Sequence, residues 1–417
     1  MEKQDFNEGL MGFLDASPTP FHATNNMAMM FENAGFIRLF EEDEWDLVAG
    51  KKYYVVRNDA SIIAFTYPKK KEYVMVGAHT DSPNLKLKPN CVVKEHGVVR
   101  FGVEPYGGLL LSTWFDRSLS LAGKVVYLDK EGKMQSALID VQKPIASIPS
   151  LAIHLDETAN KNKTINKQTD ISPILTTNED FEFEEFLLWQ LAKLGIEDVQ
   201  KIYGSELSFY DVQKASYVGL RDDFIASARL DNLLSCYTAM VAMCSIPDDK
   251  AMLFVANDHE EVGSDTTSGA GGSFLENTLR RMFQDYDEYV QVVRSSLFVS
   301  ADNAHAIHPN FPSKHEKEHT PYINNGVVIK INANQRYASN ANTISRIVHT
   351  ASLLHLHTQN YVVRSDMGCG STIGPITATR IGIESVDVGV PTYAMHSIRE
   401  MCGSDDAHQL YTILLNL

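Results

Sequence analysis

Four short apolar segments, each followed by a turn that carries imidazole or carboxylate side chains, constrain this sequence more than any other feature. They are 73–76 before His79 and Asp81, 252–255 before Glu260 and Glu261, 297–299 before Asp302, and 390–394 before His396. Short continuous apolar runs are typical of strands buried on both faces, as in the central sheet of an α/β domain. Because ligands gather beyond the carboxyl ends of such strands, we expect the four turns to converge on one site.

A fifth contributor is Asp231, which precedes an apolar stripe with helical spacing between 233 and 244. The collected side chains are those of His79, Asp231, Glu260, Glu261, Asp302 and His396. A set of nitrogen and oxygen donors without cysteine favours zinc, with manganese or cobalt as alternatives, in a hydrolytic site. Charge favours two ions, since two divalent cations balance three ligating carboxylates and one hydroxide. Without metal, the crowded carboxylates would raise one another's pKa.

The adjacent Glu260 and Glu261 can divide two tasks between them. Their side chains point in different directions in an extended turn, so that one can bind metal while its neighbour holds the attacking water. A two-metal hydrolase needs this division, because a carboxylate free of metal must carry the proton of that water. Asp81 follows His79 by two residues and is placed to accept the second ring N–H of that histidine.

Each of these residues, taken singly, has a purely structural explanation. Asp231 alone would be a helix N-cap, the glutamate pair a solvated turn, and His79 or His396 a hydrogen-bonded loop histidine. The recurrence of such residues after four apolar segments is what favours a metal site.

A competing metal motif, HEKEH at 315–319, matches the HExxH pattern of single-metal proteases. That pattern needs a helix so that both imidazoles share one face, whereas Pro312 and Pro321 bracket a polar segment without an apolar stripe. We therefore predict that this segment is not a helical zinc site. The glycine-rich stretch 263–272 lacks the ending of a phosphate-binding loop, and its position indicates backbone packed against the site.

Composition limits the class of partner and the compartment. The chain has 37 Lys and Arg against 53 Asp and Glu, and its net charge of −16 argues against nucleic acid or an anionic membrane as partner. The 5 cysteines are scattered and form no CxxC motif, which argues against disulfides and favours a reducing compartment. Because no secretory signal pattern and no long apolar span is visible, we expect a cytoplasmic protein.

The length of the chain and the change in residue pattern along it predict two domains, since 417 residues exceed what one core usually holds. The chain opens with helices, and Thr19 followed by Pro20 marks the start of one of them. Residues 89–221 are rich in strand-like segments with one acidic helix. We expect a catalytic domain formed by 1–88 and 222–417 around an inserted domain of 89–221.

Eight longer motifs resemble a single known family. They are GAHTDSPNLKLKP (77–89), YGGLLLSTWFDRSLSLAGKV (106–125), IPSLAIHLD (148–156), NDHEEVGS (257–264), SADNAHAIHPNF (300–311), QRYASN (335–340), GSTIGPI (370–376) and AMHSIRE (394–400). They resemble the aspartyl aminopeptidase family of dinuclear zinc metalloaminopeptidases, from the N-terminal helices to near the C-terminus. The resemblance implies a mixed-sheet α/β/α catalytic domain of the dinuclear-zinc exopeptidase type with an inserted β-rich dimerisation domain.

The resemblance also implies which residue binds which metal ion. His79 and Asp302 would bind one zinc ion, Glu261 and His396 would bind the other, and Asp231 would bridge both. The activity implied is the removal of N-terminal residues from small peptides.

Further roles follow from the same resemblance. Glu260 would be the general base, and Asp81 would support the first histidine ligand. Lys330 and Tyr337 would line the pocket for the substrate's first side chain, and His305 would lie near the scissile carbonyl. A lysine in that pocket implies a preference for N-terminal Asp or Glu.

Assembly is implied as well, because relatives form dodecamers from dimers and a histidine matching His154 reaches a neighbouring subunit's site. The sequence departs from many relatives at 326–328, where Gly-Val-Val replaces Gly-Pro-Val, and in a shorter insert than eukaryotic members have. Three alternatives stay open. They are a preference for neutral or hydrophobic first residues, an amidohydrolase or carboxypeptidase with a similar site, and an inactive assembly or cargo-binding relative.

Overall fold

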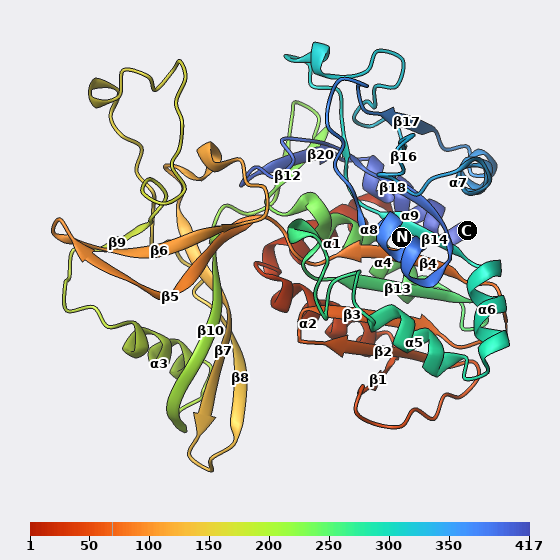
Figure 1. Cartoon of the computed structure of the whole chain (residues 1–417), viewed down its shortest axis with the longest axis horizontal. Coiled ribbons are helices and arrows are strands. Elements are labelled where there is room, and N and C mark those ends of the chain that lie inside the picture. The colour runs from red at the N-terminus through yellow and green to blue at the C-terminus, as the bar shows by residue number, and fades with distance from the viewer. Residues whose placement is uncertain (69) are drawn as a thin grey trace. The chain divides into compact units, whose positions relative to one another are not determined.

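The computed structural model describes residues 1–68 and 70–417. The chain divides into two compact units. The first consists of Met1–Ser82, Ala215–Met395 and Glu400–Leu417, and the second of Pro83–Lys214 with His396–Arg399. Figure 1 shows the elements of each unit. In the described part of the chain, every helix is too short or too polar to cross a bilayer.

A mixed β-sheet forms the centre of the first unit, with strand order β1-β2-β3-β13-β4-β14-β18-β16-β17. Its strands are β1 (Ile37–Leu39), β2 (Lys52–Arg57), β3 (Ser61–Thr66), β4 (Val74–His79), β13 (Met252–Asn257), β14 (Leu297–Ala301), β16 (Val327–Ile331), β17 (Thr358–Val362) and β18 (Glu384–Gly389). Three of the four predicted apolar segments form β4, β13 and β14, which are adjacent, parallel and buried. The mixed α/β class is therefore confirmed.

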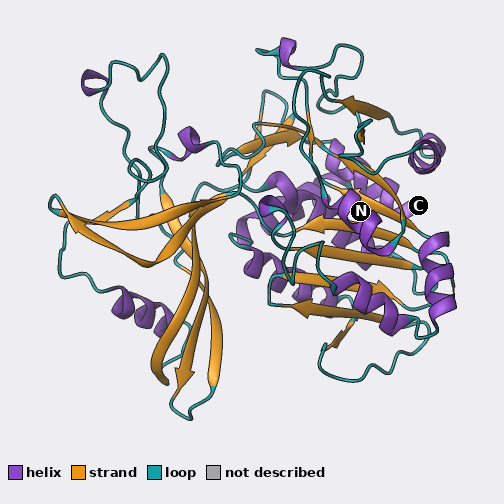
Figure 2. Ribbon diagram, in the orientation of Figure 1, coloured by secondary structure: helices purple, strands orange, loops and turns teal. Residues whose placement is uncertain are grey.

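Helices cover both faces of this sheet, as Figure 2 shows for the first unit. One core packs against α1 (Lys3–Ala16), α2 (Pro20–Asn33), α4 (Leu230–Ser245), α7 (Ala341–Leu353) and α9 (Asp406–Asn416), and the other against α5 (Phe274–Met282), α6 (Tyr286–Ser295) and α8 (Ile373–Ile381). Alternation along a strand supplies both cores, since Val76 and Ala78 of β4 face one and Met75 faces the other.

A second, smaller sheet of the first unit contains the fourth apolar segment, which we had expected in the central sheet. Its order is β11-β12-β20-β19-β15, formed by β11 (Ser216–Val218), β12 (Phe224–Ser227), β20 (Glu400–Gly403), β19 (Pro391–Tyr393) and β15 (Ala304–His305). The neighbouring segment 384–389 takes the place in the central sheet as β18. Pro391 has no N–H to donate to a ladder, and it is accordingly the first residue of β19.

The helix predicted from Thr19 and Pro20 is α2, which begins at Pro20 with Thr19 at its N-cap. The Thr19 side chain makes no capping hydrogen bond and instead contacts the ring Nδ1 of His22 at 2.8 Å. Pro20 itself suits the first turn, because its missing N–H would have no partner there.

The second unit contains an antiparallel sheet of order β8-β7-β10-β5-β6-β9. Its elements are β5 (Asn84–Glu95), β6 (Val98–Tyr106), β7 (Leu119–Asp129), β8 (Met134–Asp140), β9 (Ile174–Thr176), α3 (Phe183–Lys193) and β10 (Val199–Asp211). The acidic helix predicted here is α3, which buries Leu187 and Leu191 in the unit's own core, where Phe101 and Phe209 also lie. This unit therefore has the separate core that an independent domain needs.

Candidate metal centre

The carboxyl ends of three parallel strands bring the candidate ligands of the first unit together. In the paired register, His79 at the end of β4 lies opposite Asn257 at the end of β13, and Ser300 of β14 lies opposite Gly77. Glu260 and Asp302 follow shortly after β13 and β14. Side chains from three distant parts of the chain therefore reach the same edge of the sheet, as the parallel arrangement predicts.

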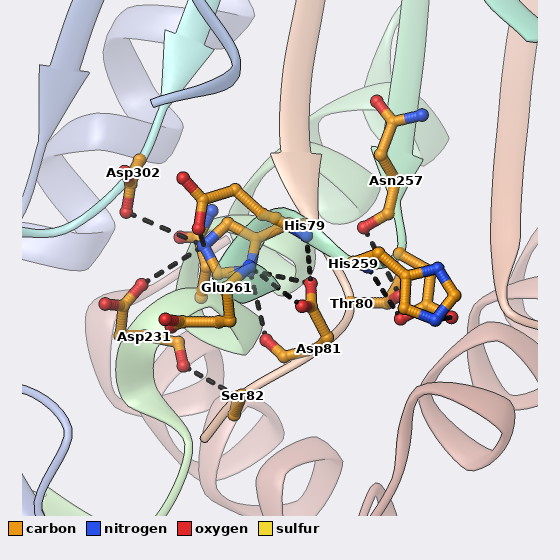
Figure 3. A network of polar contacts seen from close by, with 12 residues as sticks. His79, Thr80, Asp81, Ser82, Asp231, Asn257, His259, Glu261 and Asp302 are labelled. Atoms are coloured by element: carbon orange, nitrogen blue, oxygen red, sulfur yellow. Dashed lines mark hydrogen bonds and ion pairs between the residues drawn. The ribbon is translucent and has the colours of Figure 1, made fainter. Parts of the chain in front are cut away.

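His79 is the centre of this cluster and is only 1% exposed. Its Nε2 lies 3.3 Å from Asp231 Oδ1, 3.8 Å from Asp302 Oδ1 and 4.0 Å from Glu260 Oε2. Figure 3 shows Asp231, Glu261 and Asp302 around the imidazole. Since all these neighbours of Nε2 are hydrogen-bond acceptors, this nitrogen must either carry a proton or face a cation.

Asp81 holds the opposite side of the His79 ring. Nδ1 of His79 lies 3.0 Å from the Asp81 carbonyl oxygen and 3.2 Å from Asp81 Oδ1, both of which only accept hydrogen bonds. The proton of the neutral ring therefore belongs on Nδ1, which leaves the lone pair of Nε2 able to bind a metal ion. The same carboxylate accepts the backbone N–H of Glu260 at 3.1 Å and that of Glu261 at 3.0 Å. One buried side chain thus orients a histidine and the glutamate pair together.

Asp231 stands at an irregular start of α4, where Arg229 has a left-handed φ of 60° and Asp231 and Asn232 depart from helical geometry. Its backbone N–H donates to Glu400 Oε2 at 2.9 Å, and its carbonyl accepts from Ser82 Oγ at 2.7 Å. Asp231 is not the N-cap of the helix, a position that Arg229 occupies. Its side chain instead points toward His79 (Figure 3).

The electrostatics of the cluster favour bound cations. Burial alone would lower the pKa of His79, but the carboxylates of Asp231, Asp302 and Asp81 outweigh it and hold that pKa well above its usual range. Burial raises the pKa of Glu260 to about 8; the His79 charge opposes this effect, and the charges of Asp302, Glu261 and Asp231 add to it. In the chain alone, the negative charge of the clustered carboxylates is therefore reduced by retained protons. In a metalloenzyme, bound divalent cations balance that charge instead.

The donor set fits a divalent transition metal. The ligand atoms of His79, Asp231 and Asp302 all lie within 4.8 Å of one another, and the same limit holds for His79, Glu260 and Glu261. One imidazole nitrogen with several carboxylate oxygens, and no thiolate, is a combination that zinc accepts in hydrolytic sites.

A buried cation lies beside this cluster. Lys330 of β16 is only 3% exposed, and its Nζ lies 3.3 Å from Asp302 Oδ2. The same Nζ lies 5.4 Å from the ring centroid of Tyr337, which is also buried. Asp302 therefore contacts His79 through one oxygen and the lysine through the other.

Comparison with known proteins agrees with this geometry. The family model described as aminopeptidase I zinc metalloprotease (M18) matches residues 13–416. This chain belongs to the M18 family. A "Probable M18 family aminopeptidase 2" of Pseudomonas putida (strain GB-1) is 52% identical over 415 residues, which are 98% of this chain and 96% of the relative.

Solved structures of M18 aminopeptidases share the fold. A chain of the "Cryo-EM structure of the Ape4 and Nbr1 complex" has a TM-score of 0.95 at 36% identity, covering 99% of this chain and 85% of its own. A chain of the "Structure of S. cerevesiae mApe1 dodecamer" has a TM-score of 0.85 at 26% identity, covering 99% of this chain and 96% of its own. The predicted family and the predicted zinc aminopeptidase class are confirmed.

Not all candidate residues of this M18 chain belong to the unit that contains the cluster. His305 does belong to that unit and lies exposed in β15, with its ring 5.8 Å from that of Tyr361. His396 belongs to the second unit, where its Nδ1 lies 3.0 Å from the Gly108 carbonyl oxygen. His154 also belongs to that unit, in the exposed 3-10 turn Ile153–Leu155. The functions of all three stay predictions.

The HEKEH segment is not helical, as its flanking prolines predict. A 3-10 turn, Pro312–Lys314, precedes it, and bends lie at residues 315 and 317–319. Nε2 of His315 accepts the backbone N–H of His308, and His319 pairs with Glu316. The two histidines of the motif therefore have different partners.

Sequence reasoning assigned no role to Glu400, although its buried carboxylate accepts the backbone N–H of Asp231. These two residues are 169 positions apart. Glu400 ends the AMHSIRE motif, but a charged side chain within a short β-like segment is more often solvent-exposed than buried.

Proposed function

We propose that this M18 aminopeptidase removes N-terminal Asp or Glu from peptides with two zinc ions and Glu260 as general base. The observation that carries the proposal is the cluster of buried His79, Asp231 and Asp302 with half-buried Glu261, beside the ammonium group of Lys330. Asp302 would then lie next to both the dinuclear site and Lys330, the cation that would bind the acidic side chain of the substrate.

In the proposed assignment, His79 and Asp302 hold one ion, Glu261 and His396 hold the other, and Asp231 bridges them. The close approach of His79, Asp231 and Asp302 supports the first of these sites. The donor set suits zinc, with manganese or cobalt as alternatives.

Bound zinc would lower the pKa of the attacking water and polarise the scissile carbonyl. Glu260 would accept a proton from that water as it attacks and then return the proton to the leaving amine. A pKa of about 8 in the chain alone indicates that Glu260 holds a proton readily, and bound cations would lower this pKa toward the working range of a base. His305 would lie near the scissile carbonyl.

The preference for acidic residues rests on Lys330 and Tyr337. A buried ammonium group attracts a carboxylate strongly, because little water separates the two charges. Lys330 already contacts the Asp302 carboxylate, and zinc bound to Asp302 would weaken that ion pair and leave the lysine available to the substrate. The Tyr337 ring beside the ammonium would form the other wall of the pocket.

Self-association is proposed for the second unit, with His154 reaching the site of a neighbouring subunit in a homododecamer. The turn that carries His154 exposes the side chains of Leu151, Ile153 and Leu155. A cluster of exposed apolar residues is typical of a protein interface. The related mApe1 chain comes from a dodecamer, which supports the same arrangement here. Such an assembly would limit entry to small peptides.

The test is a panel of equal-length peptides that begin with Asp, Glu or Leu, each with a free and an acetylated N-terminus. We expect zinc-loaded protein to prefer Asp and Glu over Leu by at least about tenfold in kcat/KM, and to cleave no acetylated peptide. Lys330→Met should abolish the preference, while Lys317→Met on an exposed loop serves as the matched control.

Other results of this panel would identify the alternatives. A preference for Leu would identify the neutral-preferring class, and cleavage of acetylated peptides a carboxypeptidase or amidohydrolase. Zinc binding without hydrolysis of any peptide would identify an inactive relative.

A further inference from the structure

Asp387 is a fully buried carboxylate to which the proposed chemistry assigns no part. It belongs to β18 and is 0% exposed. In the sheet, β18 lies between β14, which leads to Asp302, and β16, which carries Lys330. Burying a carboxylate costs free energy unless its oxygens are hydrogen-bonded, so its partners indicate its role.

Those partners belong to two segments beside the pocket. Asp387 Oδ2 accepts the backbone N–H of Ala338 at 2.6 Å, and its own N–H donates to Ser339 Oγ at 2.9 Å. Asp387 Oδ1 accepts the hydroxyl of Thr372, the N-cap of α8. One side chain thus holds both the loop at 335–340 and the start of a helix against the central sheet.

The loop held by Asp387 carries the tyrosine of the proposed pocket. Ala338 directly follows Tyr337, whose ring centroid lies 5.4 Å from Lys330 Nζ. Strands β16 and β18 pair antiparallel with Ile329 opposite Val388. Continuing that register by one residue brings Lys330 opposite Asp387, on the same face of the sheet. The carboxylate is therefore next to both residues that would contact the substrate's first side chain.

Electrostatics agrees with this placement. Burial raises the pKa of Asp387, and the Thr372 hydroxyl, the Lys330 charge and the Ala338 N–H each act to lower it. Lys330 therefore has a second carboxylate near it besides Asp302.

The packing around Asp387 is also specific. A Cβ atom added to Gly374 of α8 would lie 2.5 Å from Asp387 Oδ2, closer than non-bonded atoms can approach. A glycine at this position lets the first turn of the helix approach the carboxylate. Thr372 and Gly374 both belong to the GSTIGPI motif at 370–376.

We propose that Asp387 is a positioning residue that holds Tyr337 and Lys330 in place to receive an acidic first side chain. This inference rests on the proposed function, because it concerns the same pocket. Asp387 contacts neither the proposed metal ligands nor the scissile bond in this role. Its effect should therefore appear in the recognition of the substrate rather than in the chemical step.

The test measures KM and kcat on Asp- and Leu-initiated peptides for Asp387→Ala and Asp387→Asn. Asp387→Ala should raise KM for the Asp peptide about tenfold, change kcat less than about threefold and leave the Leu peptide unaffected. Asp387→Asn should recover most of this loss, since its amide can keep both contacts once the Thr372 hydroxyl accepts instead of donating. Equal losses on both peptides, or two variants that behave alike, would overturn the proposal.

A double-mutant cycle with Lys330→Met tests whether Asp387 acts through the pocket. In the Lys330→Met background, Asp387→Ala should cause no further change in selectivity, whereas additive effects would contradict the proposal. If Lys330→Met leaves the wild-type selectivity intact, the proposed acidic specificity itself is wrong. If Lys330→Met removes selectivity and Asp387→Ala does not, only the inference about Asp387 fails.

A milder variant keeps the test valid if Asp387→Ala does not fold. Ser339→Ala removes one acceptor of the network and should raise KM for the Asp peptide about two- to fivefold. Ser385→Ala is its matched control, because this buried hydroxyl of the same strand contacts the Ile383 carbonyl rather than the loop. Equal KM values for the two serine variants would overturn the proposal.

Discussion

The Asp81 carboxylate lies against His79, with 3.2 Å between Asp81 Oδ1 and His79 Nδ1, and both side chains are buried. The same carboxylate accepts the backbone N–H groups of Glu260 and Glu261. A histidine on one strand and two glutamates after another are therefore held in one geometry by a residue that need not touch metal. Such partners of metal ligands commonly set the affinity of a site.

Asp81→Asn should weaken zinc binding by roughly 10- to 100-fold, because an amide cannot accept both glutamate N–H groups and the histidine ring proton. Competition with a chelator of known affinity measures the change. Asp59→Asn in an exposed turn is the matched control. Unchanged zinc affinity in Asp81→Asn would show that Asp81 does not organise the site.

Glu260→Gln should keep its zinc and lose at least about 100-fold in kcat, since an amide cannot carry the proton of the attacking water. Metal analysis of the purified variant and steady-state kinetics on an Asp-initiated peptide provide the two readouts. Glu44→Gln, at an exposed position outside the helices and strands, is the control. Turnover at the wild-type rate would exclude Glu260 as the general base.

Zinc binding should release protons at pH 7. In the chain without metal, His79 has a pKa well above its usual range and Glu260 a pKa of about 8, so both are protonated at that pH. Metal ligation must remove the proton from His79, and cations nearby lower the pKa of Glu260. Apparent zinc affinity should therefore increase as pH rises from 6 to about 8.

Titration calorimetry of zinc into metal-free protein in buffers of different ionisation enthalpy counts the released protons. We expect about one proton fewer per subunit in Glu260→Gln than in the wild type. A zinc affinity that does not change between pH 6 and 8 would contradict the electrostatic account of the cluster.

Glu316→Gln should leave kcat/KM within about twofold of the wild-type value, because Glu316 belongs to an exposed pair with His319 outside the metal cluster. Its thermal unfolding should match that of the wild type for the same reason. If Glu316→Gln loses activity and Glu260→Gln remains active, the result would instead support a single-metal HExxH site.

Asp406 should make stability depend on pH. Burial raises the pKa of this carboxyl to about 7, although the N–H groups of Gly326 and Asn324 act to lower it. A raised pKa means that the folded state binds more protons than the unfolded state between about pH 4 and 7. Stability should therefore fall with increasing pH across that window, by at most about 1.4 kcal/mol per pH unit, and be constant above it.

Thermal unfolding of the wild type and Asp406→Asn in excess zinc, from pH 5 to 8, measures this contribution. The asparagine side chain cannot ionise. As pH rises, the variant should therefore gain stability relative to the wild type, and this difference should become constant above about pH 7. A difference that is constant from pH 5 to 8 would show that Asp406 does not titrate in this range.

The amino-acid sequence by itself determined the central strands and most of the metal cluster. Short uninterrupted apolar segments are typical of strands that are buried on both faces of a sheet, and this local property identified β4, β13 and β14. Because parallel strands end at the same edge, the polar residues after them had to meet, and His79, Glu260 and Asp302 do so. The same reasoning assigned segment 390–394 to the central sheet, where β18 stands instead.

Tertiary structure alone decided how the buried polar residues are paired. Two hydrogen-bonded pairs, Glu400 with Asp231 and Asp387 with Ala338, illustrate this. The members of each pair lie far apart in the chain, and neither pair leaves a periodic signal in the sequence. A carboxylate is stable in a core only where packing supplies its donors, and those donors come from segments that folding brings together. Local composition therefore predicted where the site forms, while long-range packing determined the orientation of each side chain in it.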